Sequence, residues 1–132
     1  MLVLVAAAAA LAGCGGSPGD LLAIDVSGGA AGRDQRIVVE NNGNATCNGG
    51  SSRDIGSEAL IDAREIERDL KDPAQDAAVY GSGRRGATSY VARTKDGTVR
   101  WQEGAPGLPP VLPKAQLFAL QQGRALCRGG GG

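Results

Sequence analysis

Two alternating apolar runs joined by a glycine-rich corner constrain the fold of this chain more than any other stretch. The first run ends at Ile24-Asp25-Val26, the corner is Ser27-Gly28-Gly29-Ala30-Ala31-Gly32, and the second run covers residues 35–40. Alternation at period two predicts a strand on each side, and glycines let the chain reverse sharply between them. We therefore expect a β-hairpin whose corner contacts a partner. The alternative is a plain turn whose glycines serve backbone geometry alone.

Further strands are expected on both sides of the middle of the chain. Residues 45–48 form a short strand that returns along the second run. Residues 88–95 and 98–103 alternate apolar and polar side chains around Asp96-Gly97, which is a strong two-residue hairpin signal. Together these segments predict a small antiparallel sheet of four to five strands.

Two main helices are expected to pack against this sheet. Residues 58–71 carry one apolar stripe, and Ser57 is placed to cap the first turn. Residues 111–122 form the closing helix, which Gly123 ends. Between them, a helix of one or two turns begins at Asp72, with a proline at its first helical position. The predicted fold class is therefore α+β.

The amino-terminal segment predicts the cellular location of the protein. Residues 1–13 are uncharged, apolar and too short for a membrane-spanning helix, so they are interpreted as a signal peptide. The segment ends in Leu11-Ala12-Gly13-Cys14, which resembles the lipobox of bacterial lipoproteins. That resemblance implies lipidation of Cys14. The glycine-rich composition of residues 14–20 predicts a flexible tether, and the length of the chain predicts a single domain, over residues 21–128. The alternative is a chance apolar run that ends in a buried cysteine.

The other two cysteines predict a disulfide. With Cys14 acylated, Cys47 and Cys127 remain as an even pair in an oxidising compartment. A bridge between them would close a loop of about 80 residues and stabilise the domain by about 4–5 kcal/mol. A zinc site or a reactive thiol is a weaker alternative. The glycine tail, residues 129–132, is expected to be disordered.

Composition excludes several classes of function. The chain has 14 basic and 14 acidic residues, which gives no electrostatic signature of a nucleic-acid partner. Histidine is absent, which removes Ser-His-Asp and Cys-His arrangements and nearly all catalytic zinc sites. We therefore expect no enzyme activity, no cofactor, no metal site and no small-molecule substrate.

Two charged segments allow a functional and a plain interpretation. Acidic residues on the helix at 58–71 could form a carboxylate pair, although a solvated helix face explains them more simply. Arg84 and Arg85, in a glycine-rich loop, could bind an anion or a carboxylate of a partner. The plain interpretation of this loop is an exposed basic segment without a role.

The order of these elements resembles that of emfourin-type proteins, small α+β inhibitors of thermolysin-like zinc metalloproteases. The residues that carry the resemblance are the corner at Ser27–Gly32, Tyr90 with Lys95-Asp96-Gly97, and Leu108-Pro109 before the final helix. The resemblance covers residues 24–120. It implies that the corner, already ordered between two strands, occludes the active-site cleft of such a protease.

Two hypotheses about function follow. The first is a secreted inhibitor, related to emfourin and held by the lipid on Cys14 to the outer, extracytoplasmic face of a bacterial membrane. In that hypothesis the partners are the membrane and a zinc metalloprotease. The second is a protein-interaction module of the bacterial cell envelope without an inhibitory role.

Overall fold

The computed structural model of the protein describes residues 19–29, 34–81 and 84–127. The expected signal peptide, Cys14, most of the tether and the glycine tail lie outside these residues. The strands within them are β1 (Asp20–Gly28), β2 (Gln35–Glu40), β3 (Asn44–Cys47), β4 (Arg53–Asp54), β5 (Val79–Tyr80), β6 (Thr88–Thr94) and β7 (Gly97–Gln102). The helices are α1 (Ser57–Asp69), α2 (Lys71–Gln75) and α3 (Val111–Leu126).

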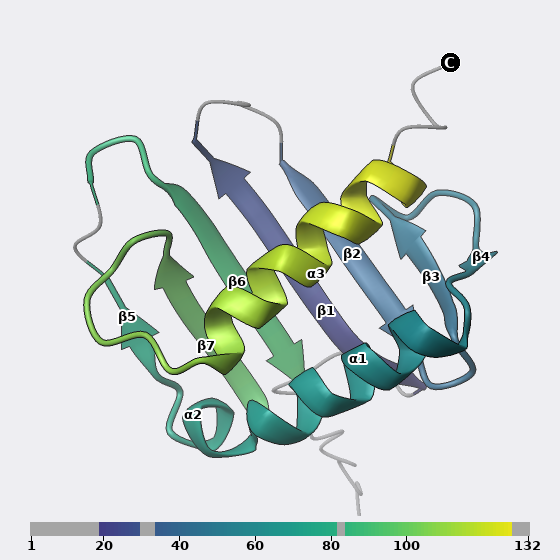
Figure 1. Ribbon diagram of the computed structural model, residues 1–132, viewed down its shortest axis with the longest axis horizontal. Coiled ribbons are helices and arrows are strands. Elements are labelled where there is room, and N and C mark those ends of the chain that lie inside the picture. The colour runs from purple at the N-terminus through teal and green to yellow at the C-terminus, as the bar shows by residue number, and fades with distance from the viewer. Residues whose placement is uncertain (1–18, 30–33, 82–83, 128–132) are drawn as a thin grey trace, which may run out of the picture.

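The strands form one seven-stranded sheet in the order β4-β3-β2-β1-β6-β7-β5. Every neighbouring pair is antiparallel except β5 and β7, which run parallel. Figure 1 shows α1 and α3 crossing the same face of this sheet, with α2 near the β7 side. The predicted α+β class with two main helices is therefore confirmed, and the two central hairpins are those expected from the sequence.

The predicted sheet of four to five strands is too small. The two additional strands, β4 and β5, contain two residues each, so they are too short to show any alternation in the sequence. Hydrogen bonds to residues distant in sequence hold both of them in the sheet. The amide of Ile55 donates to the carbonyl of Gly43, and the amide of Arg100 donates to the carbonyl of Ala78, each at 3.0 Å. The sheet therefore gains one strand at each edge.

The helix boundaries also differ from those expected. Gly56, and not Ser57, is the residue at the N-cap of α1, and no side chain caps that helix. The short helix α2 begins at Lys71, one residue before the expected cap at Asp72. Helix α3 continues through Gly123 to Leu126, because Gly123 is buried close to β2 and its missing side chain permits that contact. A glycine inside a helix thus serves packing here and not termination.

The core lies between the sheet and the two long helices. Trp101 of β7 is buried, stacks on Tyr90 of β6 with ring centroids 5.2 Å apart, and donates from Nε1 to Oε1 of Gln116 at 2.8 Å. This hydrogen bond satisfies the one polar atom that the indole brings into the core. The other large side chains that are fully buried are aliphatic: Leu22, Ile24, Ile37, Val39, Ile66, Leu70, Val99 and Leu112.

Candidate functional site

The described part of the glycine corner is the end of β1. Ser27 and Gly28 are its last two residues and are exposed, and Gly29 follows directly. Gly28 and Gly29 have φ angles of 71° and 74°, a left-handed conformation that favours glycine. The remaining predicted partner-binding residues lie outside the described residues: Ala30, Ala31 and Gly32.

Strand β6 supports this corner from the side opposite β2. Ser27 pairs with Ser89, and Gly28 pairs with Thr88. A Cβ atom built on Gly29 would lie 2.1 Å from Oγ1 of Thr88, so the second glycine of the corner passes β6 at close range. Both glycines therefore meet a conformational requirement and Gly29 also meets a steric one, so the sheet fixes the start of the corner.

The corner and the expected membrane tether lie at opposite ends of β1. Asp20 is the first residue of this strand and Gly28 is the last. At a rise of about 3.3 Å per residue, the eight steps between them span about 26 Å. In Figure 1 the end of β1 and the start of β2 lie at the top of the sheet, and β1 begins at the bottom. If the chain is anchored to a membrane before Asp20, β1 thus separates the corner from the point of attachment.

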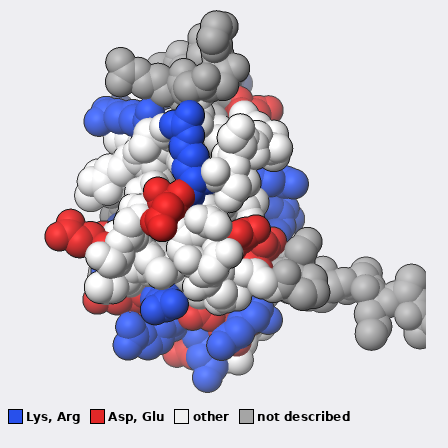
Figure 2. All heavy atoms as spheres, turned by 90° about the vertical axis from the view of Figure 1, so that its right-hand side faces the viewer, with Lys and Arg blue, Asp and Glu red and all other residues white. Residues whose placement is uncertain are grey.

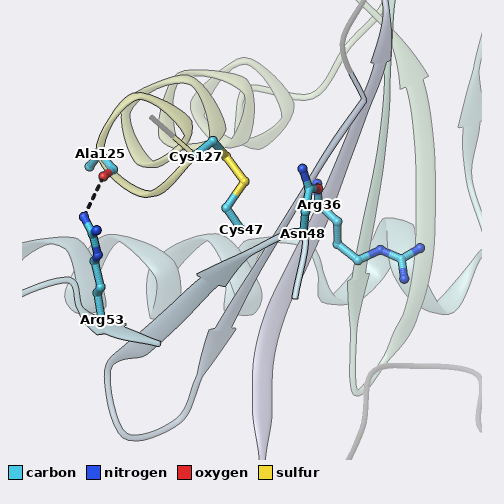
Figure 3. Close-up of a disulfide and its surroundings, with 6 residues drawn as sticks. All are labelled: Arg36, Cys47, Asn48, Arg53, Ala125 and Cys127. Atoms are coloured by element: carbon cyan, nitrogen blue, oxygen red, sulfur yellow. Dashed lines mark hydrogen bonds between the residues drawn. A yellow bond between two sulfur atoms is a disulfide. The ribbon is translucent and has the colours of Figure 1, made fainter. Parts of the chain in front are cut away.

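The predicted disulfide is present. Cys47, at the end of β3, is bonded to Cys127, directly after α3, with a Cα–Cα distance of 5.3 Å (Figure 3). The guanidinium of Arg53 also reaches the last turn of α3 and donates to the carbonyl of Ala125 at 3.4 Å. The carboxyl end of α3 is therefore attached to the β3–β4 side of the sheet.

A charged cluster on the face of the sheet opposite α1 and α3 was not expected from the sequence. Asp25 of β1 accepts two hydrogen bonds from Arg36 of β2, at 2.6 and 3.2 Å, and one from Arg93 of β6. Asp25 follows the buried Ile24 along β1, so the strand alternation directs it to the face away from the helices. The acidic residue within an otherwise apolar run was the available signal for this cluster.

The two arginines stabilise the charged form of Asp25. Partial burial acts to raise the pKa of Asp25, but hydrogen bonds and positive charge from Arg36 and Arg93 outweigh it, and the pKa lies below its ordinary value. Because the folded pKa is the lower one, this stabilisation is complete above the unfolded value of about 3.9. It is lost as the pH falls through the folded pKa.

We expect Asp25→Asn to remove part of the acid sensitivity of folding. Between pH 7 and pH 2, the wild-type protein should lose on the order of 1 kcal/mol more unfolding free energy than this variant, since the cluster is partly solvent-accessible. Urea denaturation at both pH values measures the difference. Asp76→Asn, at an exposed carboxylate after α2, is the matched control and should keep the wild-type difference. An equal pH dependence in Asp25→Asn and wild type would contradict this role.

The described residues contain neither a candidate metal site nor a helix that could span a membrane. No group of three or more Cys, Asp or Glu side chains is placed there to hold a metal ion. None of the helices in the same ranges combines the length and apolarity needed to cross a bilayer. Figure 2 shows acidic and basic groups interspersed over the side of the molecule that lies on the right in Figure 1.

The fold and site thus define a small α+β domain with a disulfide between Cys47 and Cys127 and a glycine corner at one end of a sheet that two helices cover on one face. Comparisons with protein-family models, with curated proteins and with solved structures find no match for this chain.

Proposed function

We propose that the protein is an inhibitor of a thermolysin-type metalloprotease, held to the extracytoplasmic face of the bacterial cell envelope by a lipid on Cys14. The corner after β1 enters the active-site cleft of the protease and blocks access of substrate. The observation that carries this proposal is the pair of glycines where β1 ends: Gly28 is exposed, Gly29 is half-buried, and β6 holds both in place. A segment ordered before binding loses little conformational entropy in the complex.

Two further observations support the location in this proposal. The disulfide between Cys47 and Cys127 is of the kind that persists in oxidising compartments. The start of β1, which follows the expected tether, lies about 26 Å along the strand from the corner. A lipid on Cys14 would therefore leave the corner directed away from the membrane surface.

We expect Gly28→Val to weaken inhibition by at least about tenfold, the change for a loss of about 1.4 kcal/mol. Valine strongly disfavours the left-handed backbone at this position, so the corner would change its direction. The measurement is the inhibition constant of the purified chain against several thermolysin-type enzymes. Gly107→Val is the matched control, because Gly107 has a similar φ angle of 74° but lies in the turn before α3. Absence of inhibition by the wild-type chain across these enzymes would contradict the proposal.

The second candidate is an interaction module of the cell envelope, and a different surface favours it. Ile61 of α1 and Leu117 and Leu120 of α3 are each more than half exposed, at 55%, 54% and 52%. The ion pair between Glu65 and Lys114, at 2.6 Å, brings the two helices together beside these side chains. Leu117→Glu with Leu120→Glu should leave protease inhibition unchanged under the first proposal. Under the second, the same pair of changes should abolish capture of a partner that is not a protease.

A further inference from the structure

A pocket of about 480 Å³ lies between the loop before β6 and the turn after β7. This volume is within the range of pockets that bind small chemical groups. Half of the described residues that line it are charged. The residues that line it are Arg84, Arg85, Gly86, Ala87, Glu103 and Gly104.

The lining of the pocket lies next to the start of the corner. A Cβ atom on Gly28 would lie 3.5 Å from the carbonyl oxygen of Ala87, which lines the pocket. Thr88, the next residue, pairs with Gly28, and its carbonyl accepts a hydrogen bond from the amide of Glu103 at 2.9 Å. Backbone contacts thus join the end of β1 to both sides of the pocket lining, so a partner bound at the corner would lie beside the pocket.

The arginines of the pocket differ from those of the sheet. Arg36 and Arg93 are held by Asp25, whereas the side chains of Arg84 and Arg85 make no hydrogen bond or ion pair with any described residue. Both are exposed, and guanidinium groups stay charged at any physiological pH. Two parallel N–H groups of a guanidinium match the two oxygens of a carboxylate. The basic wall of the pocket is thus available to an anionic ligand.

Glu103 limits the charge of that ligand. It is the single acidic residue of the described lining, so that lining carries a net charge of about +1 from two arginines and one glutamate. A monoanionic carboxylate matches this balance. A dianionic phosphate group would exceed it and would meet repulsion from Glu103. The lining therefore favours a carboxylate over a phosphate.

We infer that this pocket binds a carboxylate of the partner protein, which Arg84 and Arg85 receive while the corner is engaged. The carboxylate is either an acidic side chain or the carboxyl terminus of the partner. Glu103 opposes a second negative charge and so restricts the approach to one orientation. The inference rests on the proposed function in one respect, that the partner of this surface is a protein bound through the corner.

Short peptides test the inference directly on the purified chain by nuclear magnetic resonance. The probes are acetyl-Gly-Glu-Gly-amide for a side-chain carboxylate and acetyl-Gly-Gly-Gly with a free carboxyl terminus. Acetyl-Gly-Gln-Gly-amide is the neutral counterpart, and inorganic phosphate is the dianionic one. We expect one or both carboxylate probes to shift the amide signals of residues 84–87 at millimolar concentrations, and the other two probes to shift them much less.

Variants with opposite expected effects separate binding from a change in folding. Arg84→Gln with Arg85→Gln should weaken peptide binding at least about tenfold, whereas Glu103→Gln should tighten it about threefold, as Coulomb interactions at an exposed site allow. Arg124→Gln, at an exposed arginine of α3 outside the lining, is the matched control and should bind as wild type does. Equal shifts by the glutamine peptide, tighter binding of phosphate, or the same loss in Arg124→Gln would overturn the inference.

The outcome is distinguishable from that of the proposed function. If the carboxylate peptides bind and the chain inhibits no protease, the pocket stands and the proposed inhibition fails. If the chain inhibits a protease, the peptides do not bind, and the double arginine variant inhibits as wild type does, the pocket inference alone fails.

Discussion

Replacing Cys47 and Cys127 together by alanine should lower the free energy of unfolding by about 4.5 kcal/mol, the chain-entropy value for a loop of this length. The two cysteines are 80 residues apart in sequence, and their bond joins the end of β3 to the end of α3. Because a small domain has only about 5–15 kcal/mol of net stability, this is a large fraction of the total. Urea denaturation of wild type and variant measures it.

Reductant supplies the control for this prediction. The wild-type chain in excess dithiothreitol should unfold at the same urea concentration as the double variant, and the double variant should not respond to dithiothreitol. A loss of less than about 1 kcal/mol, well below the chain-entropy value, would mean that packing of α3 alone holds the helix on the sheet.

Gly97→Ala should cost at least about 3 kcal/mol of unfolding free energy, since it combines backbone strain with overpacking. Gly97 begins β7 with a φ angle of 141°, and a Cβ atom there would lie 2.3 Å from the carbonyl oxygen of Ala74 in α2. The clashing atom belongs to the backbone, so no side-chain rotation relieves it. The expected result is displacement of α2 from the β6–β7 hairpin.

Gly104→Ala separates these two contributions. Gly104 also has a positive φ angle, 75°, but a Cβ atom there meets no other atom within 4 Å. This variant should therefore show only the strain of the left-handed backbone, about 1 kcal/mol. Urea denaturation of both variants gives the comparison, and equal losses would show that α2 yields to the added methyl group without cost.

Sequence patterns predicted the parts of this fold that local interactions determine. The runs around Ser27–Gly32 and around Asp96-Gly97 carry their own turn signals, and both are hairpins in which the register keeps apolar side chains on one face. The disulfide followed from the number of cysteines. By contrast, β4 and β5 have no local signal, because hydrogen bonds to residues distant in sequence form them.

The candidate sites also differ in whether local sequence or contacts between distant residues form them. The glycines of the corner are visible in the sequence because their conformation is local. The cluster at Asp25 depends on the pairing of β1 with both β2 and β6, which brings Arg36 and Arg93 to the same carboxylate. The pocket depends on the β6–β7 pairing, which places Glu103 beside the loop of Arg84 and Arg85. Spacing along the chain does not encode either arrangement.

Steady-state kinetics test the proposal that the corner occludes the cleft of a thermolysin-type protease. Substrate turnover is measured at several concentrations of the purified chain. Occlusion predicts competitive inhibition, in which the apparent KM rises with the concentration of the chain while kcat stays constant. A fall in kcat at constant KM, or no change in either, would contradict it.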